Sequence, residues 1–306
     1  FKSGGPGSGL YSTYDGGETW KRLGSDEGLP KGELGRIGIG IAKSNPDVVY
    51  ALVEAKRNAL YRSEDGGQSW KMVNDSRSVN GRPFYYADIR VDPQNENRIY
   101  SLQTNLTVST DGGKTFSNIT PGNRVHSDHH ALWINPLDGS QLIDGNDGGL
   151  AISNDRGKTW RFVENLPLGQ FYHINVDMEI PYNIYGGMQD NGSWRGPGEL
   201  WENGGIRNWH WNEVGFGDGF ATIVDASDAN CGYAMSQAGG LIRFNRKTGE
   251  RKDIRPWGPD EIELRFNWNA GIAGDPFDPK TIYYGSQFIH KSTDRGDSWT
   301  INSPDL

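Results

Sequence analysis

The chain has 306 residues, of which 34% are hydrophobic and 23% charged, and its net charge is −8 at pH 7. The positive residues are scattered along the sequence, so the composition argues against a nucleic-acid partner. No run of about 18 apolar residues occurs, as a membrane-spanning helix would need, and the single cysteine excludes an internal disulfide.

A short pattern, Ser/Thr-x-Asp-x-Gly-x-Ser/Thr-Trp/Phe, occurs five times. The copies begin at Thr13, Ser63, Ser109, Ser153 and Ser292, and their aspartates are Asp15, Asp65, Asp111, Asp155 and Asp294. The aspartates lie 50, 46, 44 and 139 residues apart, and the last interval is close to three periods, so two repeats have lost the pattern. A period of this size is typical of blades or stacked units rather than of one irregular core.

A second landmark is an Asn or Asp that opens a turn before an apolar strand. It occurs at Asn45, Asp92, Asn135, Asp177, Asp225 and Asp275. Asx and Pro turns before such runs predict strands. Together with the first pattern, the landmark predicts four short strands in each repeat. Four-stranded antiparallel units repeated radially form a β-propeller.

We therefore predict an all-β fold, a β-propeller of about seven four-stranded antiparallel blades in a single domain, 1–306. The expected blades are 1–34, 35–79, 80–124, 125–167, 168–213, 214–263 and 264–306. Only 14 residues precede Asp15, enough for one strand, so the first blade is expected to be incomplete. We interpret the sequence as a piece of a longer polypeptide that supplies the missing strands.

The residue types of the repeated pattern suit a hairpin between the third and fourth strands. Its aspartate can accept backbone N–H bonds across the turn, and its second glycine tolerates a positive φ. Its aromatic side chain is expected to pack in the layer between sheets. These roles are structural, and they carry no chemistry of their own.

The segments Thr13-Tyr-Asp-Gly-Gly-Glu-Thr-Trp20 and Ser63-Glu-Asp-Gly-Gly-Gln-Ser-Trp70 resemble the Asp-box, also called the BNR repeat. Segments 187–192 and 265–269 look most like the sortilin-like (VPS10) branch of large secreted bacterial proteins, often labelled glycosyl hydrolases. The resemblance spans the chain and implies a propeller, but it hardly specifies an activity. Sialidase activity is disfavoured, because no Arg-Ile-Pro segment occurs.

In a propeller, the loops that enter each first strand and those between second and third strands emerge on one face. The Asp-box turns emerge on the other. The residues predicted to bind a ligand on the first face are His126, His129, Tyr172, Gln189, Asn191, Arg265, Asn267 and Trp268. Such groups suit a peptide, protein or polysaccharide ligand. Alternatively, they satisfy loop backbone groups.

The densest cluster of titratable residues is His126-Ser-Asp128-His129-His130. Alternate residues of a strand share a side, so His126, Asp128 and His130 are candidate ligands of a Zn²⁺ or similar ion. The alternative is that these histidines pair with Asp128 or with loop carbonyls. No cofactor is expected.

Glycoside cleavage would need two carboxylates that face each other across the substrate. The candidates are Asp128, Asp147, Asp190 and Asp218. Three of them lie beside glycine or Asn-Gly, where an aspartate can simply stabilise a turn.

The favoured function is a recognition propeller that is secreted, periplasmic or on the cell surface. The alternatives are a glycoside hydrolase that uses two of the four aspartates, and a scaffold module of a larger assembly. The expected partners are a peptide, protein or glycan ligand and further segments of the same parent protein.

Overall fold

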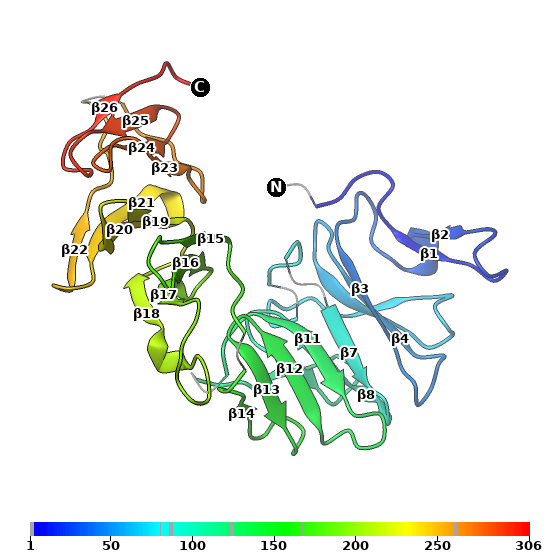
Figure 1. Ribbon diagram of the computed structural model, residues 1–306. Coiled ribbons are helices and arrows are strands. Elements are labelled where there is room, and N and C mark those ends of the chain that lie inside the picture. Colours follow the sequence, from blue (N-terminus) through cyan, green and yellow to red (C-terminus); the bar gives the residue numbers. More distant parts are fainter. Residues whose placement is uncertain (1–2, 80, 86–87, 123–124, 167, 260–261) are drawn as a thin grey trace. The chain divides into compact units, whose positions relative to one another are not determined.

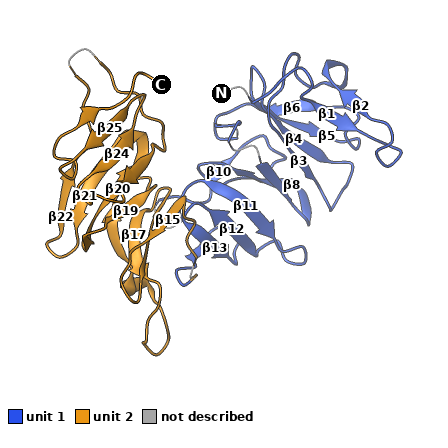
Figure 2. Cartoon of the chain, turned by 45° about the horizontal axis from the view of Figure 1, so that its top comes forward, with its two compact units in different colours: residues 1–165 blue, residues 166–306 orange. Residues whose placement is uncertain are grey.

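A computed structural model of the chain (Figure 1) describes residues 3–79, 81–85, 88–122, 125–166, 168–259 and 262–306. Within these ranges the regular elements are strands and three short 3₁₀ helices. No helix in the described ranges is long and apolar enough to cross a membrane. The chain divides into two compact units, 1–165 and 166–306, which are coloured blue and orange in Figure 2. A single domain stays a prediction.

The described residues of unit 1 form fourteen strands and one 3₁₀ helix, η1. They are β1 Leu10–Ser12, β2 Lys21–Leu23, η1 Ser25–Glu27, β3 Ile37–Ile41, β4 Val49–Val53, β5 Ala59–Ser63, β6 Lys71–Asn74, β7 Asp88–Asp92, β8 Asn95–Leu102, β9 Thr107–Ser109, β10 Ser117–Asn118, β11 His129–Ile134, β12 Leu142–Asn146, β13 Gly149–Ser153 and β14 Arg161–Phe162.

In unit 2 the part of the chain that the structure describes forms twelve strands and two 3₁₀ helices. They are β15 His173–Val176, β16 Asn183–Met188, β17 Gly192–Pro197, η2 Asn208–His210, β18 Asn212–Gly215, β19 Thr222–Asp225, β20 Asp228–Ser236, η3 Gln237–Gly239, β21 Gly240–Asn245, β22 Glu250–Asp253, β23 Ile272–Gly274, β24 Ile282–Gly285, β25 Ile289–Ser292 and β26 Thr300–Ile301.

Across the described ranges the strands form six four-stranded sheets and one two-stranded sheet, β1–β2. Within each sheet consecutive strands are neighbours and every pairing is antiparallel. These sheets are the blades of a β-propeller, and the predicted fold class is confirmed, including the incomplete first blade. One expected boundary differs slightly: β18 continues to Gly215, two residues past the expected end of its blade.

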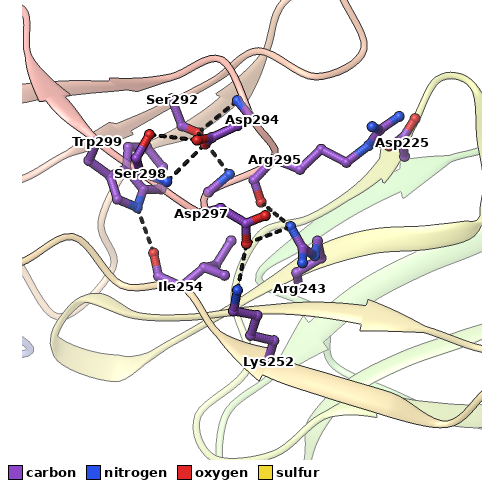
Figure 3. Close-up of polar contacts among 11 residues, drawn as sticks. Asp225, Arg243, Lys252, Ile254, Ser292, Asp294, Arg295, Asp297, Ser298 and Trp299 are labelled. Carbon is purple, nitrogen blue, oxygen red and sulfur yellow. Dashed lines mark hydrogen bonds and ion pairs between the residues drawn. The ribbon is translucent and has the colours of Figure 1, made fainter.

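The repeated pattern forms a hairpin that we call the aspartate turn, residues 13–20, 63–70, 109–116, 153–160 and 292–299. In the last copy, the Ser292 hydroxyl donates to Asp294 Oδ1 over 2.8 Å and accepts the Gly296 N–H over 2.7 Å. Asp294 also accepts the N–H (2.8 Å) and the hydroxyl (2.5 Å) of Ser298 (Figure 3). The same four bonds recur in the other copies.

These bonds stabilise the ionised aspartate. The hydroxyl and the backbone N–H of the residue four positions later lower the pKa of Asp65, Asp155 and Asp294 to about 2. The Thr115 backbone N–H and hydroxyl lower the pKa of Asp111 to about 2 as well. The expected role of the aspartate in bridging the turn therefore agrees with the hydrogen bonds that it accepts.

In two copies the tryptophan of the turn reaches the preceding blade. The Trp160 indole N–H donates to the Ile119 carbonyl over 2.9 Å, and the Trp299 indole donates to the Ile254 carbonyl over 2.8 Å (Figure 3). Both acceptors directly follow the fourth strand of the preceding sheet. In the first two copies the indole donates instead to the second glycine of its own turn.

In three copies of the turn the second glycine lies close to the preceding blade. Gly113 has φ +92°, and an added Cβ would lie 2.7 Å from Leu60 Cδ2, closer than real Cβ contacts. The preceding position has φ near +63° in two copies, where it is Arg156 and Arg295. That position therefore accepts a side chain, whereas all five copies keep glycine at the second position.

Charged groups also connect the last two blades of unit 2. Arg295 Nε lies 2.7 Å from Asp225 Oδ2, and the Arg295 carbonyl accepts a bond from Arg243. Asp297 forms ion pairs with Arg243 over 3.1 Å and with Lys252 over 2.6 Å (Figure 3). The pairs of Asp297 are half exposed, so their contribution to stability is modest, whereas the Asp225 carboxylate is buried.

Replacing Gly113 by alanine should destabilise the fold more than the same change at Gly17, which occupies the same place in the first turn. Both have positive φ, for which a Cβ costs about 1–2 kcal/mol. Only Gly113 faces a blade atom at close range; at Gly17 the nearest atom to an added Cβ is 3.8 Å away. Urea unfolding should show a loss of about 2–4 kcal/mol for Gly113→Ala. Equal losses for both variants would contradict the account.

Stability should fall steeply between pH 4 and pH 2. The turn aspartates have folded pKa values near 2, below their ordinary value of 3.8. Their stabilisation is therefore present above about pH 4 and is lost as the pH falls through the folded pKa. In urea titrations at pH 5 and pH 2.5, the joint change of Asp65 and Asp111 to asparagine should flatten this dependence. Glu250→Gln, in the exposed strand β22, is the control and should leave the slope unchanged.

Candidate functional site

Each complete blade has a turn end and a rim end. In the four complete blades that carry an aspartate turn, this turn donates a backbone N–H at the turn end to a carbonyl between the first and second strands or, at Asn97, near the start of the second strand. The pairs are Gly66 to Asp47, Gly112 to Asn97, Arg156 to Ser140 and Arg295 to Lys280. The rim end carries the segment that enters the first strand and the connection between the second and third strands. The predicted site residues lie at the rim end.

A side-chain carbonyl or carboxylate near the end of the second strand holds the entering segment in four blades. The bonds run from the Arg36 N–H to Glu54 (2.9 Å), from Gly81 to Gln103 (3.1 Å), from Asp218 to Gln237 (2.9 Å) and from Arg265 to Gln287 (2.8 Å). The role of Glu54 was not predicted from the sequence. A signal was present, because these residues follow the Asn or Asp landmark at similar spacings.

At the rim end of unit 2, the Asp218 side chain accepts hydrogen bonds from two other segments. Its Oδ1 accepts the Asp190 backbone N–H over 3.1 Å, and its Oδ2 accepts the Trp268 indole N–H over 2.9 Å. Asp218 is only 8% exposed. Both carboxylate oxygens are therefore used to hold segments from neighbouring blades.

Two aromatic rings at this rim are exposed, and each is fixed by a polar contact. The Tyr172 ring stacks on Phe220 with centroids 4.9 Å apart and planes 19° apart, and its hydroxyl donates to Gln189. Trp268 is exposed and is held through its bond to Asp218. The rings belong to different blades and present rigid apolar surface to solvent.

A further bond joins the same two blades. Asn269 Nδ2 lies 2.9 Å from His173 Nε2. Because the amide nitrogen can only donate, Nε2 is the acceptor in this bond. We call Tyr172, His173, Asp218, Trp268 and Asn269 the aromatic rim site.

In the blade of Trp268 lies a pocket of about 400 Å³. Its polar lining includes Arg265, Asn267 and Gln287. The Arg265 guanidinium forms an exposed ion pair with Asp305 over 2.9 Å. Asn191, in the blade of Tyr172, donates through Nδ2 to the Gln189 carbonyl over 2.8 Å. The structure thus brings Tyr172, Gln189 and Asp190 together with Asp218 and Trp268, while Arg265 and Asn267 line the pocket.

The rim end of unit 1 contains a buried carboxylate–imidazole pair. His129 Nδ1 lies 2.8 Å from Asp144 Oδ2, and both side chains are almost fully buried. His129 Nε2 lies 3.4 Å from the Thr120 hydroxyl, and Asn146 donates to Asp144 over 2.9 Å. This pairing is typical of a satisfied core histidine. A ligand contact for His129 stays a prediction.

The candidate metal ligands do not share one strand face. Asp128 has φ +64°, and β11 begins only at the next residue, so the assumed alternation is wrong here. His126 contacts the Ser127 carbonyl, and His130 Nε2 lies 2.9 Å from Asp147 Oδ1. In the described parts of the chain, no three His, Cys, Asp or Glu side chains are grouped to hold a metal ion.

The four candidate catalytic aspartates form two neighbouring pairs, one in each unit. In unit 1 the Asp147 N–H donates to the Asp128 carbonyl over 3.1 Å, and in unit 2 the Asp190 N–H donates to the Asp218 carboxylate. Asp147 also pairs with His130. The contacts of Asp147 and Asp218 are those of structural carboxylates, and a catalytic role for any of the four stays a prediction.

No protein-family model and no curated protein matches the chain. Among solved structures it is similar to a GH74 enzyme of Niastella koreensis, at 17% identity and TM-score 0.37, over 86% of this chain and 37% of that one. It is also similar to the GH74 xyloglucanase from Xanthomonas campestris, at 14% identity and TM-score 0.36, over 88% and 38%. A third is YCF48 bound to a D1 peptide, at 13% identity and TM-score 0.34, over 87% and 81%. The chain spans less than two-fifths of the length of both GH74 enzymes.

Truncating Asp218 should destabilise unit 2, because two N–H donors would lose their acceptor. Removing a buried partner in this way costs about 1–3 kcal/mol. Asp147→Ala is the matched control at the other rim end. Its partner His130 is substantially exposed, so a loss of about 1 kcal/mol or less is expected. Chemical denaturation of both variants gives the comparison, and an unchanged Asp218→Ala protein would refute the structural role of Asp218.

Proposed function

We propose that the chain is a recognition module that binds a peptide or glycan ligand at the aromatic rim site. The observation that best supports this proposal is the pair of exposed rings, Tyr172 and Trp268, each held in place by a polar contact at its edge. Asn269 and His173 supply polar groups beside the rings. The pocket lined by Arg265 and Asn267 supplies additional polar groups within the same blade as Trp268.

Rigid rings of this kind suit ligands with flat apolar patches between polar groups. A sugar ring offers C–H groups on one face and hydroxyls at its edge, and a peptide alternates side chains with backbone amides. Because Phe220 and Asp218 already fix the two rings, little side-chain freedom is lost on binding. These features support recognition at this surface.

Glycoside hydrolysis has weaker support. It needs one carboxylic acid that donates a proton and a second carboxylate that attacks or activates water. Asp218 accepts N–H bonds on both oxygens, so both oxygens already hold the Asp190 segment and Trp268 in place. We therefore rank binding above hydrolysis, and we rank the scaffold role third because an assembly role alone does not require exposed rings.

The family and location are part of the same proposal. The aspartate turns resemble the Asp-box, and segments 187–192 and 265–269 resemble the sortilin-like branch of secreted propellers. On this basis we propose that the chain belongs to an Asp-box propeller that is secreted, periplasmic or at the cell surface. Its expected partners are an extended peptide, a protein or a polysaccharide.

Binding should depend on the two exposed rings. Screening the wild-type chain on a glycan array should identify a glycan ligand, and screening it against a peptide library should identify a peptide ligand. For that ligand, Trp268→Ala and Tyr172→Ala should each raise the Kd about tenfold, as the loss of roughly 1.4 kcal/mol of ring contact implies.

Trp201→Ala is the matched control. Trp201 is 96% exposed but lies between β17 and β18, at the turn end of its blade. The Trp201→Ala substitution should leave the Kd unchanged. An equal loss of affinity in all three variants would count against a site at the rim.

Any bound glycan should release no reducing sugar. Turnover that disappears in both Asp128→Ala and Asp218→Ala would establish the hydrolase instead.

A further inference from the structure

Unit 1 contains a hydroxyl, an imidazole and a carboxylate in one hydrogen-bonded series. The Thr120 hydroxyl lies 3.4 Å from His129 Nε2, and His129 Nδ1 lies 2.8 Å from Asp144 Oδ2. Thr120 follows β10 in one sheet, whereas His129 and Asp144 belong to β11 and β12 of the next sheet. The order of the groups is that of a Ser–His–Asp triad, which is recognised by geometry and not by position in the sequence.

The imidazole is held in the orientation that a general base needs. The side chains of His129 and Asp144 are 1% and 0% exposed. Asn146, the register partner of His129, donates through Nδ2 to Asp144 Oδ2 over 2.9 Å and so fixes the carboxylate. Because a carboxylate accepts, His129 Nδ1 is the donor in its pair with Asp144. In the neutral imidazole, Nε2 is then left to accept the hydroxyl proton.

The threonine hydroxyl is fixed by two further contacts. Its oxygen accepts the Leu106 N–H over 3.3 Å, and it lies 3.2 Å from Asn118 Oδ1, a second acceptor for the hydroxyl proton beside His129. The separation of 3.4 Å between hydroxyl and imidazole is longer than the ideal for a nucleophile and its base, and such contacts tighten when substrate binds. The Leu106 N–H stabilises the threonine oxygen as its proton leaves.

Thr120 and His129 both line a pocket of about 460 Å³. The lining also includes Asn105, from the connection between β8 and β9, and Val125. The Asn105 amide can donate an N–H to an oxygen that becomes negatively charged during a reaction. Val125 supplies apolar surface for a small acyl group. A carbonyl group in this pocket would therefore meet a nucleophile, a base and a hydrogen-bond donor.

We propose that Thr120 and His129, positioned by Asp144, hydrolyse carboxylic esters that have a small acyl group. Thr120 Oγ1 attacks the carbonyl carbon while His129 Nε2 takes the hydroxyl proton. The bond to the alcohol oxygen then breaks, and His129 returns the proton to that oxygen. Water attacks the acyl-threonine, His129 passes a proton from this water to Thr120 Oγ1, and the carboxylic acid leaves. This activity is separate from recognition at the aromatic rim site, which belongs to unit 2.

Labelling with a fluorophosphonate, which reacts irreversibly with activated hydroxyls, tests the nucleophile. Peptide mapping by mass spectrometry should place the adduct on Thr120. Thr120→Ser keeps a less crowded hydroxyl and should label at least as fast, whereas Thr120→Val keeps the shape of the side chain and should not label. Ser117→Ala, in the exposed strand β10, is the control and should label as the wild type does. No adduct in the wild type, an adduct only at another residue, or one that persists in Thr120→Val overturns the proposal.

Hydrolysis of p-nitrophenyl acetate gives a second readout. The wild-type chain should release several equivalents of nitrophenolate per chain, and Thr120→Val should abolish this release. Asp144→Asn should lower kcat at least about 100-fold and leave KM unchanged, because the imidazole loses the carboxylate that fixes its tautomer. Equal rates for the wild type and Thr120→Val would overturn the proposal. An unchanged kcat in Asp144→Asn would refute the positioning role of Asp144.

Discussion

The contact between an aspartate turn and the blade before it is the constraint on which this architecture depends. The second glycine permits the turn to approach apolar side chains such as Leu60, and Trp160 and Trp299 add a hydrogen bond to a carbonyl of the preceding blade. The serine–aspartate bonds hold the hairpin in the conformation that makes this approach possible. Because the turn ends are fixed in this way, the loops at the rim ends can differ without loss of the fold.

The rim ends combine a repeated structural device with features that are specific to one blade. A Glu or Gln near the end of the second strand holds the entering segment in four blades. These Glu and Gln side chains therefore have a structural role at the rim ends. The remaining exposed rings, Tyr172 and Trp268, are therefore informative, since their positions are fixed by Phe220 and Asp218 rather than required by strand pairing.

The sequence predicted the blades well because their signals are local and periodic. The turn at Ser109 and the landmark at Asp92 recur with nearly constant spacing and mark strand ends. The site was predicted only in outline. Asp218 and Trp268 do meet, but the bond from Trp268 to Asp218 spans 50 residues and has no local signature. The left-handed backbone at Asp128 likewise depends on tertiary contacts, and it broke the strand alternation that the metal hypothesis assumed.

Indole hydrogen exchange followed by NMR tests the link between blades most directly. The N–H groups of Trp160 and Trp299 should exchange slowly and at rates that rise with urea, because their acceptors belong to the preceding blade. The N–H of Trp20, which is bonded within its own exposed turn, should exchange at least about tenfold faster. Equal rates for all three indoles would contradict the claim that the turns join neighbouring blades.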